Sequence, residues 1–276
     1  MTYHLPIMKI TILTPSFNQG SFIEKNIRSV TSQSYTNFEH IVIDGGSTDN
    51  TIEILKKYLH LKWVSEPDEG QADALNKGLA MATGDIIGWI NSDDYYQKNI
   101  FHDVASHFKN PNIQWIIGDI THFYKEAGIK KAIKCQEITY TNLLKNPDIV
   151  KQQGVFFRKN LLDKVGGWNK DFHMIMDFDL WLRLSILHPP KMVHKNYAYF
   201  LWHDDQKSNP KNIVRQIKEI NKLLLENKAN PLDRYRMMLK KYYYLFKSFV
   251  KSWLISAGII NKKFSAIPIS TFRKYK

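Results

Sequence analysis

Cysteine and long apolar runs are both scarce in this sequence of 276 residues. The one cysteine, Cys135, has no partner for an intramolecular disulfide, which agrees with a reducing compartment. No stretch approaches the ~20 consecutive apolar residues that a membrane-spanning helix needs. Residues 1–8 lack the apolar core of a secretion signal, so we expect the chain to act in the cytoplasm.

Acidic residues are scarce in the last quarter of the chain. The whole sequence has 39 Lys and Arg against 26 Asp and Glu, a net charge of +13. Residues 207–276 hold 17 of the basic and 3 of the acidic residues, which leaves 22 basic and 23 acidic residues in 1–206. The body is therefore nearly neutral, and the excess charge belongs to an appended segment. A neutral body without zinc-finger spacing argues against a nucleic-acid partner.

Short apolar runs alternate with amphipathic segments in the first half. The predicted strands are 10–14, 39–43, 61–65 and 85–91, and the predicted helices are 21–32, 48–58 and 71–82. After Asn99 the pattern is weaker, with strands at 114–119, 154–157 and 198–202, a helix at 178–187, and helix throughout from Lys211. This alternation predicts an α/β fold with a mixed, mostly parallel sheet flanked by helices. Asn209-Pro210 divides a domain of residues 1–209 from a basic, amphipathic helical extension of residues 210–276.

Ligands of parallel α/β sheets bind beyond the carboxyl ends of the strands, so the residues at those ends are the candidates. The first strand ends in Thr14-Pro15-Ser16-Phe17-Asn18, where Pro15 predicts a turn. Phe17 then lies at the rim, where it stacks on a nucleobase or packs against the next helix. Asp44 ends the second strand, where its carboxylate binds a ribose hydroxyl or a base N–H, or forms an Asp-Gly turn.

Two further acidic segments follow the third and fourth strands. Asp68 and Gln71 face the same edge of the sheet or cap the following helix. Asp93 and Asp94 are adjacent carboxylates, which is costly unless a cation neutralises them. Mg²⁺ or Mn²⁺, with hard oxygen ligands, is the natural cation and also binds a diphosphate. The alternative is a solvated acidic turn.

Taken in order and spacing, these motifs resemble the family 2 glycosyltransferases of the GT-A fold over roughly residues 8–206. The segments that carry the resemblance are Thr14-Pro15-Ser16-Phe17-Asn18, Ile43-Asp44-Gly45-Gly46-Ser47-Thr48-Asp49, Gly84-Asp85-Ile86-Ile87, Ser92-Asp93-Asp94, Val165-Gly166-Gly167-Trp168 and Asp177-Phe178-Asp179-Leu180-Trp181-Leu182-Arg183. The resemblance implies inverting transfer of a sugar from a nucleotide donor, with a divalent metal, in the manner of surface-polysaccharide assembly.

The resemblance also implies roles for single residues. The donor nucleotide is held by Thr14, Pro15, Phe17, Asp44, Asp68, Gln71 and Asp93. The metal ligands are Asp94, as the more direct one, Asp93 and His203, although a lone histidine is often a packing residue. Asp177 is the general base. Where the family often has Glu-Asp, Met176 replaces the glutamate, so Asp179 is the alternative base, and Asp177 is alternatively a helix cap. The sequence leaves open whether Gln152, Gln153 and Arg158 contact donor or acceptor.

Catalytic chemistry agrees with this division of roles. An inverting transfer needs a base within hydrogen-bond reach of the acceptor hydroxyl. It also needs positive charge on the departing diphosphate, which a metal supplies. Two other functions stay open at this point: a non-catalytic sugar-nucleotide or membrane-surface binding protein, and a nucleotidyltransferase.

The basic extension has a strongly amphipathic helical pattern. One face carries large apolar residues: Tyr235, Leu239, Tyr242, Phe246, Phe249 and Trp253. The other face carries Arg236, Lys240, Lys247 and Lys251. Such a helix lies in a membrane interface, or it packs its aromatic face on the catalytic domain or on a dimer partner. The first interpretation places the protein peripherally at the inner face of the cell membrane, with a saccharide or lipid-linked saccharide as acceptor.

Overall fold

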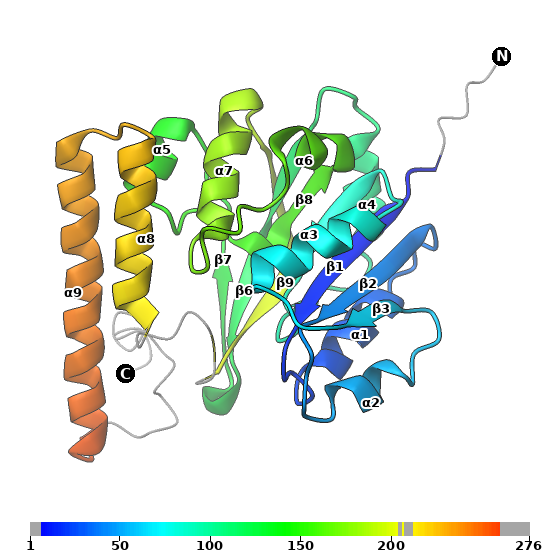
Figure 1. Cartoon of the computed structure of the whole chain (residues 1–276), viewed down its shortest axis with the longest axis horizontal. Helices are drawn as coiled ribbons and strands as arrows, with labels where there is room; N and C mark the ends of the chain where they lie inside the picture. Colours follow the sequence, from blue (N-terminus) through cyan, green and yellow to red (C-terminus); the bar gives the residue numbers. More distant parts are fainter. Residues whose placement is uncertain (1–6, 204–205, 207–211, 260–276) are drawn as a thin grey trace.

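The computed structural model describes residues 7–203, 206 and 212–259, and within them nine strands form one sheet (Figure 1). The order of the strands is β3-β2-β1-β4-β8-β6-β9-β5, with β7 paired to β6. The strands are β1 (Ile10–Ser16), β2 (Phe38–Asp44), β3 (Lys62–Ser65), β4 (Ile86–Trp89), β5 (Tyr95–Tyr96), β6 (Trp115–Tyr124), β7 (Ile129–Ile133), β8 (Val155–Arg158) and β9 (Lys191–Trp202).

Strand directions bring several carboxyl ends to one edge. Strands β1 to β4 pair in parallel, β8 runs antiparallel to both β4 and β6, and β9 is parallel to β6. The ends of β1, β2, β4 and β9 therefore point the same way. The predicted mixed, mostly parallel sheet is confirmed.

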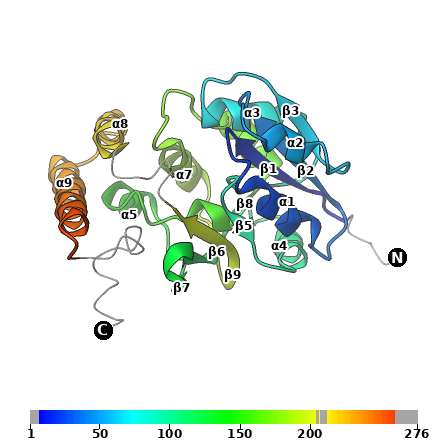
Figure 2. The ribbon, with the colours of Figure 1, turned by 90° about the horizontal axis from the view of Figure 1, so that it is seen from below.

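Helices cover both faces of the sheet (Figure 2). They are α1 (Ile23–Thr31), α2 (Thr51–Leu55), α3 (Gln71–Met81), α4 (Phe101–Phe108), α5 (Tyr140–Lys145), α6 (Lys159–Val165), α7 (Met176–Leu187), α8 (Ile213–Glu226) and α9 (Pro231–Ser256). Helices α3, α6 and α7 share one buried apolar cluster with the sheet, and α1 and α4 contribute to a second cluster.

Strand β1 corrects one prediction. It does not turn at Pro15 but runs on to Ser16, with Pro15 opposite Ile43 of β2. The ladder between β1 and β4 ends at Leu13, so the missing N–H of Pro15 removes no bond from it. Helix α2 is shorter than the predicted 48–58, and β6 and β9 are longer than predicted.

The two C-terminal helices pack on the body rather than standing apart from it. Helices α8 and α9 run side by side beyond α5 and α7 (Figure 1). Ile220, Leu223 and Leu224 of α8 belong to the same buried cluster as α7. The predicted boundary at Asn209-Pro210 lies outside the described residues, and the division into 1–209 and 210–276 stays a prediction.

Candidate active site

Asp44 ends β2 in a fully buried position at the carboxyl edge. Its Oδ2 accepts hydrogen bonds from the backbone N–H of Gly46 at 3.1 Å and of Ser47 at 2.8 Å, and from the Ser65 hydroxyl at 2.7 Å. The Ser47 hydroxyl donates to Oδ1. Asp44 therefore shapes the turn that follows β2, as the alternative interpretation of an Asp-Gly turn predicts.

The loop after β1 lies beside this turn. The Asn18 N–H donates to Ser47 Oγ at 2.7 Å, and the Thr48 N–H donates to Asn18 Oδ1 at 2.9 Å. Asn18 has a φ of 52°, a left-handed conformation that asparagine tolerates. Phe17 is 58% exposed, so more than half of its side chain is open to a planar ligand.

Two other residues of the first motif point away from the edge. The Thr14 side chain is buried, with its hydroxyl 2.9 Å from His40 Nε2 and 3.3 Å from Asn26 Oδ1. Pro15 is buried within the strand ladder. The side chains of Thr14 and Pro15 are therefore packed inside the body, and the predicted role of these residues in binding the donor stays a prediction.

The loop before α3 reaches the same edge. Asp68 Oδ1 accepts the Gly70 N–H at 2.8 Å, and its carboxylate lies against Gly45, where a Cβ would be 2.7 Å from Oδ2. Gln71 Nε2 donates to Asn91 Oδ1 at 2.7 Å. Asp68 is thus close to the turn after β2, and Gln71 is close to the segment after β4, while their contact with the donor stays a prediction.

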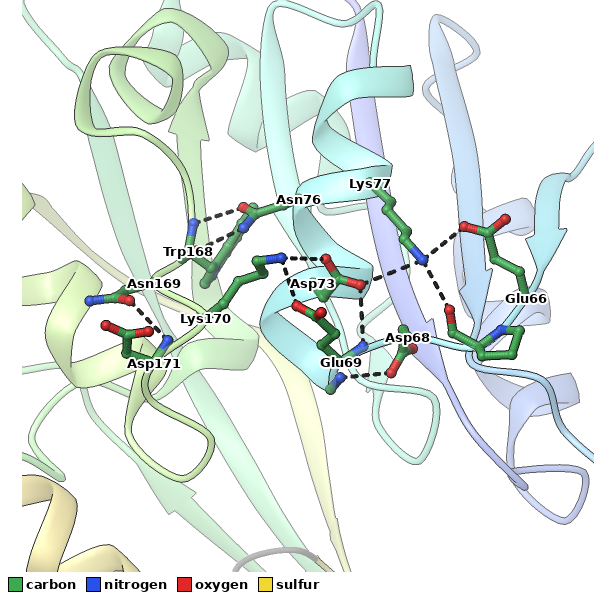
Figure 3. Close-up of polar contacts among 12 residues, drawn as sticks. Glu66, Asp68, Glu69, Asp73, Asn76, Lys77, Trp168, Asn169, Lys170 and Asp171 are labelled. Carbon is green, nitrogen blue, oxygen red and sulfur yellow. Dashed lines mark hydrogen bonds and ion pairs between the residues drawn. The ribbon is translucent and has the colours of Figure 1, made fainter.

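A polar network braces this loop from the outside (Figure 3). Lys170 pairs with Glu69 at 2.8 Å and with Asp73 at 3.3 Å. Asn76 receives the Trp168 N–H at 2.9 Å and donates to the Trp168 carbonyl at 2.7 Å. The segment that leads into α7 is therefore fixed to the segment that carries Asp68.

The adjacent carboxylates after β4 have different environments. Asp94 is 1% exposed, and it accepts hydrogen bonds from Gln153 Nε2 at 2.8 Å and from the Leu201 N–H of β9 at 2.9 Å. Asp93 Oδ2 instead lies 3.0 Å from His203 Nε2, just after β9 ends. The prediction of Asp94 as the more direct metal ligand is not supported by this geometry, because the more accessible carboxylate is Asp93.

The buried carboxyl of Asp94 is electrostatically unusual. Burial raises the pKa of Asp94 well above its ordinary range, and the neighbouring Asp93 carboxylate raises it further. The hydrogen bonds from Gln153 and Leu201 oppose this shift of the pKa.

The donor atoms fit a hard or borderline divalent cation. In an octahedral shell, two neighbouring ligand atoms that each lie about 2.1 Å from the metal are about 3.0 Å apart. Asp93 Oδ2 and His203 Nε2 are 3.0 Å apart. The His203 ring stacks on Phe22 with centroids 4.4 Å apart, which fixes its plane. His203 Nδ1 is buried without a hydrogen-bond partner among the described residues. The aspartate oxygen and imidazole nitrogen suit Mn²⁺.

Asn26 is a site residue that sequence reasoning missed. It is fully buried on α1, and its Nδ2 donates to the carbonyls of Asn91 at 2.9 Å and Asp94 at 3.0 Å. It thereby holds both ends of the turn that contains Asp93. A buried asparagine inside an amphipathic helix was the available signal, because such an amide needs polar partners.

The two predicted base candidates on α7 separate clearly. Asp179 is 5% exposed, and its Oδ2 receives Arg183 Nε at 2.9 Å and Nη2 at 2.7 Å. Both Arg183 nitrogens donate to the same oxygen of Asp179, which favours Asp177 over Asp179 as the base, and the assignment stays a prediction. Helix α7 begins at Met176 with Ile175 as N-cap, so Asp177 lies in the first turn and is not the cap.

Lys151 lies in the electrostatic environment of Asp177. Burial lowers the pKa of Lys151, while the carboxylates of Asp148 and Asp177 raise it. The Lys151 ammonium also donates to the Asp148 carbonyl at 2.7 Å. Asp177 is thus partly buried next to a cation, on a different element from Asp93.

The three residues around β8 that the sequence left undecided are structural. Gln153 holds Asp94, and Gln152 donates to the Trp89 carbonyl. Arg158 lies opposite Ile86, at the start of β4, and donates to the carbonyls of Phe108 and Ile113. Arg158 is therefore at the other end of the strand from the site.

Helix α9 turns its aromatic face outward. Six side chains of this face are 50–71% exposed: Tyr235, Leu239, Tyr242, Phe246, Phe249 and Trp253. The opposite side packs inward through Met237 and Lys241, and Lys241 forms an ion pair with Asp148 at 2.9 Å. The interpretation that the aromatic face covers the catalytic domain is wrong. Within the part of the chain that the structure describes, no helix is long and apolar enough to cross a membrane.

Comparisons with known proteins identify this arrangement. The model of glycosyl transferase family 2 matches residues 11–166. The chain is 28% identical over 236 residues to the Escherichia coli UDP-Glc:alpha-D-GlcNAc-diphosphoundecaprenol beta-1,3-glucosyltransferase WfgD, a match that covers 83% of this chain and 90% of WfgD.

Two solved structures share the fold. Staphylococcus aureus TarS 1–349 in complex with UDP has a TM-score of 0.61 at 18% identity, over 97% of this chain and 78% of TarS 1–349. Mannosyltransferase PcManGT from Pyrobaculum calidifontis, in complex with GDP-Man and Mn²⁺, has a TM-score of 0.59 at 17% identity, over 96% and 79% of the two chains. The predicted GT-A-like fold is confirmed.

Proposed function

Since the chain belongs to glycosyl transferase family 2, and is a glycosyltransferase that takes a sugar from a nucleotide-sugar donor, we propose that it transfers a hexose, with inversion, to a lipid-linked saccharide at a membrane surface. Family membership sets aside a nucleotidyltransferase and a non-catalytic binding protein. The observation that carries the finer proposal is the placing of Asp93 and His203 at one sheet edge, with Asp177 on a separate helix.

The donor nucleotide lies along the loops after β1 and β2. The exposed ring of Phe17 stacks on the base, because an aromatic ring open to the edge offers a flat apolar face. Asp68 lies against the turn after β2, where it accepts hydrogen bonds from the base and ribose, and the buried Asp44 carboxylate holds that turn in shape. Gln71, fixed to Asn91, lies between this turn and the diphosphate end.

Asp93 and His203 are the residues that would hold a divalent metal, Mn²⁺ or Mg²⁺. A bound cation supplies positive charge to the leaving diphosphate. Asp94 acts as a positioning residue, because its buried carboxylate ties the turn to Gln153 and to β9. Asn26 fixes the same turn from α1.

Asp177 is the general base. It accepts the proton of the acceptor hydroxyl as the hydroxyl oxygen forms its bond to the anomeric carbon, while the bond to the diphosphate oxygen breaks on the opposite side. The Lys151 ammonium lies within electrostatic reach of Asp177, so a positive charge stands beside the proposed base. Asp179 takes no part, since its carboxylate neutralises Arg183.

The lipid-linked acceptor and the inner-leaflet location are supported by α9 and by the relative WfgD. The exposed aromatic face of α9 runs beside the basic row Arg236, Lys240, Lys247 and Lys251, the arrangement of a helix that lies in an anionic membrane surface. The name of WfgD includes a diphosphoundecaprenol acceptor. Membrane binding of this kind brings the site to such a substrate.

A donor screen tests the enzymatic part. Release of nucleoside diphosphate is measured from UDP-, GDP- and dTDP-sugars with membrane extract as acceptor source, with and without Mn²⁺. Asp93→Ala abolishes release, and Asp177→Asn leaves donor binding intact but lowers transfer by about 10²–10⁴-fold. Asp171→Asn, an exposed carboxylate before the same helix, serves as the control and keeps full activity. Full activity of Asp177→Asn would exclude it as the base.

A further inference from the structure

Three metal-binding side chains meet on the sheet away from the residues assigned above. Asp119 lies on β6, Cys135 follows β7, and His194 lies on β9. Their potential ligand atoms all lie within 4.8 Å of one another. None of them takes part in the proposed transfer, and each comes from a different element, so the cluster is a product of the tertiary fold.

The distances match a small tetrahedral ion. Cys135 Sγ is 3.7 Å from His194 Nδ1, and His194 Nδ1 is 3.6 Å from Asp119 Oδ1. Around tetrahedral zinc, with bonds of about 2.3 Å to sulfur and about 2.0–2.2 Å to nitrogen and oxygen, these two pairs stand about 3.6 and 3.4 Å apart. These two pairs are therefore within a few tenths of an ångström of the zinc geometry, and the third pair, Cys135 Sγ and the Asp119 carboxylate, lies within 4.8 Å.

A β-bulge creates this juxtaposition. Gly118 pairs with Val193, but the next residue, Asp119, pairs with Asn196, so β9 has two unmatched residues at this point. Bulges re-aim side chains, and here the bulge places His194 beside Asp119. The second unmatched residue is Lys195, the neighbour of His194 in the sequence. Its positive charge is partly neutralised by an ion pair with Asp103 at 3.2 Å.

The remaining ligands are also held in place. The Cys135 N–H donates to Asp119 Oδ1 at 2.8 Å, which fixes the cysteine next to the carboxylate. Cys135 packs against the core cluster shared with α7, whereas the His194 side chain is 67% exposed. The cluster is therefore anchored on one side and open to solvent on the other, so an ion can enter and a water molecule can complete its shell.

We propose that Asp119, Cys135 and His194 bind one zinc ion, with water as the fourth ligand. Thiolate and imidazole favour zinc over Mg²⁺ and Mn²⁺, so this site and the Asp93–His203 pair select different metals. On binding, the Cys135 thiol gives its proton to the buffer and its sulfur donates an electron pair to the ion, without redox change. The ion ties the segment after β7 to β9.

The test uses the full chain, stripped of metal and titrated with Co²⁺ and Zn²⁺. Wild-type protein shows a thiolate-to-cobalt charge-transfer band, tetrahedral d–d bands and one equivalent of zinc bound in competition with a chromophoric chelator. Cys135→Ser abolishes the charge-transfer band. Cys135→Ser and His194→Gln each weaken zinc binding by more than the 10–100-fold that follows the loss of an outer-shell partner.

Two controls separate this site from others. Asp93→Ala keeps the charge-transfer band, which distinguishes the cluster from the proposed catalytic metal site. His60→Asn, an exposed histidine elsewhere, also keeps it. Since His194 is exposed, His194→Gln is expected to fold even where Cys135→Ser does not. No charge-transfer band in the wild type, or unchanged zinc affinity in His194→Gln, would overturn the proposal.

Discussion

The outward aromatic face of α9 gives the most quantitative prediction. Phe246 and Phe249 are 62% and 71% exposed. An aromatic side chain has about 200 Å² of surface, so roughly 120–140 Å² of each ring is free to enter a bilayer interface. At about 25 cal/mol per Å², moving one ring fully into the bilayer interface contributes about 3 kcal/mol to the binding free energy. If each ring is only half immersed, the two rings together contribute about 3 kcal/mol. The double change Phe246→Ser/Phe249→Ser should therefore weaken vesicle binding roughly 100-fold.

Flotation with vesicles that contain anionic lipid measures this effect. Leu59→Ser is the matched control, because Leu59 is 98% exposed but lies beyond α2. It should not change the partition. The basic row adds about 1 kcal/mol per residue, so neutral vesicles or high salt should weaken wild-type binding as well.

The same variants distinguish a membrane from a second copy of the chain. If the aromatic face were a dimer interface, the double serine variant would change the sedimentation of the protein without lipid. A dimer that the variant dissociates, with unchanged flotation, would refute the membrane role of α9. Binding that Leu59→Ser weakens equally would show that the interaction is non-specific.

Three further predictions concern the packed interior. Gln153→Leu removes a 2.8 Å hydrogen bond to the buried Asp94 carboxylate, and should lower the free energy of unfolding by about 1.5–3 kcal/mol in urea titrations; a loss below about 0.5 kcal/mol would contradict the assigned role. Burial lowers the pKa of His40 to about 3 in the folded protein, against about 6.5 in the unfolded chain. Between these two pH values only the unfolded chain binds a proton at His40, so the free energy of unfolding falls by about 1.4 kcal/mol for each pH unit as the pH drops. His40→Gln should remove this part of the slope between pH 5 and 6, and an unchanged slope would show that His40 is protonated in the fold. The Lys241–Asp148 pair is asymmetric, since the Lys241 side chain is 9% exposed and that of Asp148 is 54% exposed. Asp148→Ala leaves a buried cation and should lower the free energy of unfolding by about 3 kcal/mol, whereas Lys241→Met should lower it by about 1 kcal/mol. Equal losses in the two variants would contradict this asymmetry.

The sequence predicts the first half of the fold well because the parallel strands have apolar runs that end at polar residues. Asp44 and the Asn91–Asp94 segment lie at the carboxyl edge as predicted. Pro15 misleads because the effect of a missing N–H depends on whether a neighbouring strand is present at that level, and β4 has already ended. The short helices α4, α5 and α6 went unrecognised, since six to eight residues carry little periodicity.

The candidate site is less predictable because distant segments decide which side chains are available. Asp93 and Asp94 are equivalent in sequence, and they differ in the structure only because Leu201 and Gln153 reach one of them. Asp179 is different, since its spacing of four residues from Arg183 on a helix already indicated an ion pair. A carboxylate with a basic residue at that spacing is a weaker candidate for a general base than its neighbour.

One chain segment connects helix α9 to the turn that carries Asp93 and Asp94. Lys241 of α9 pairs with Asp148, the chain then passes Lys151 beside Asp177, and five residues after Asp148 it reaches Gln153, which holds Asp94. A force that displaces α9 therefore acts on the surroundings of both the proposed base and the proposed metal site. Helix α9 is also held by Met237 and Met238, which pack against the buried apolar cluster, and by the hydrogen bond from Lys240 to Asn146. The same helix that carries the exposed aromatic face is therefore joined, through one chain segment, to the surroundings of the proposed base and the proposed metal site.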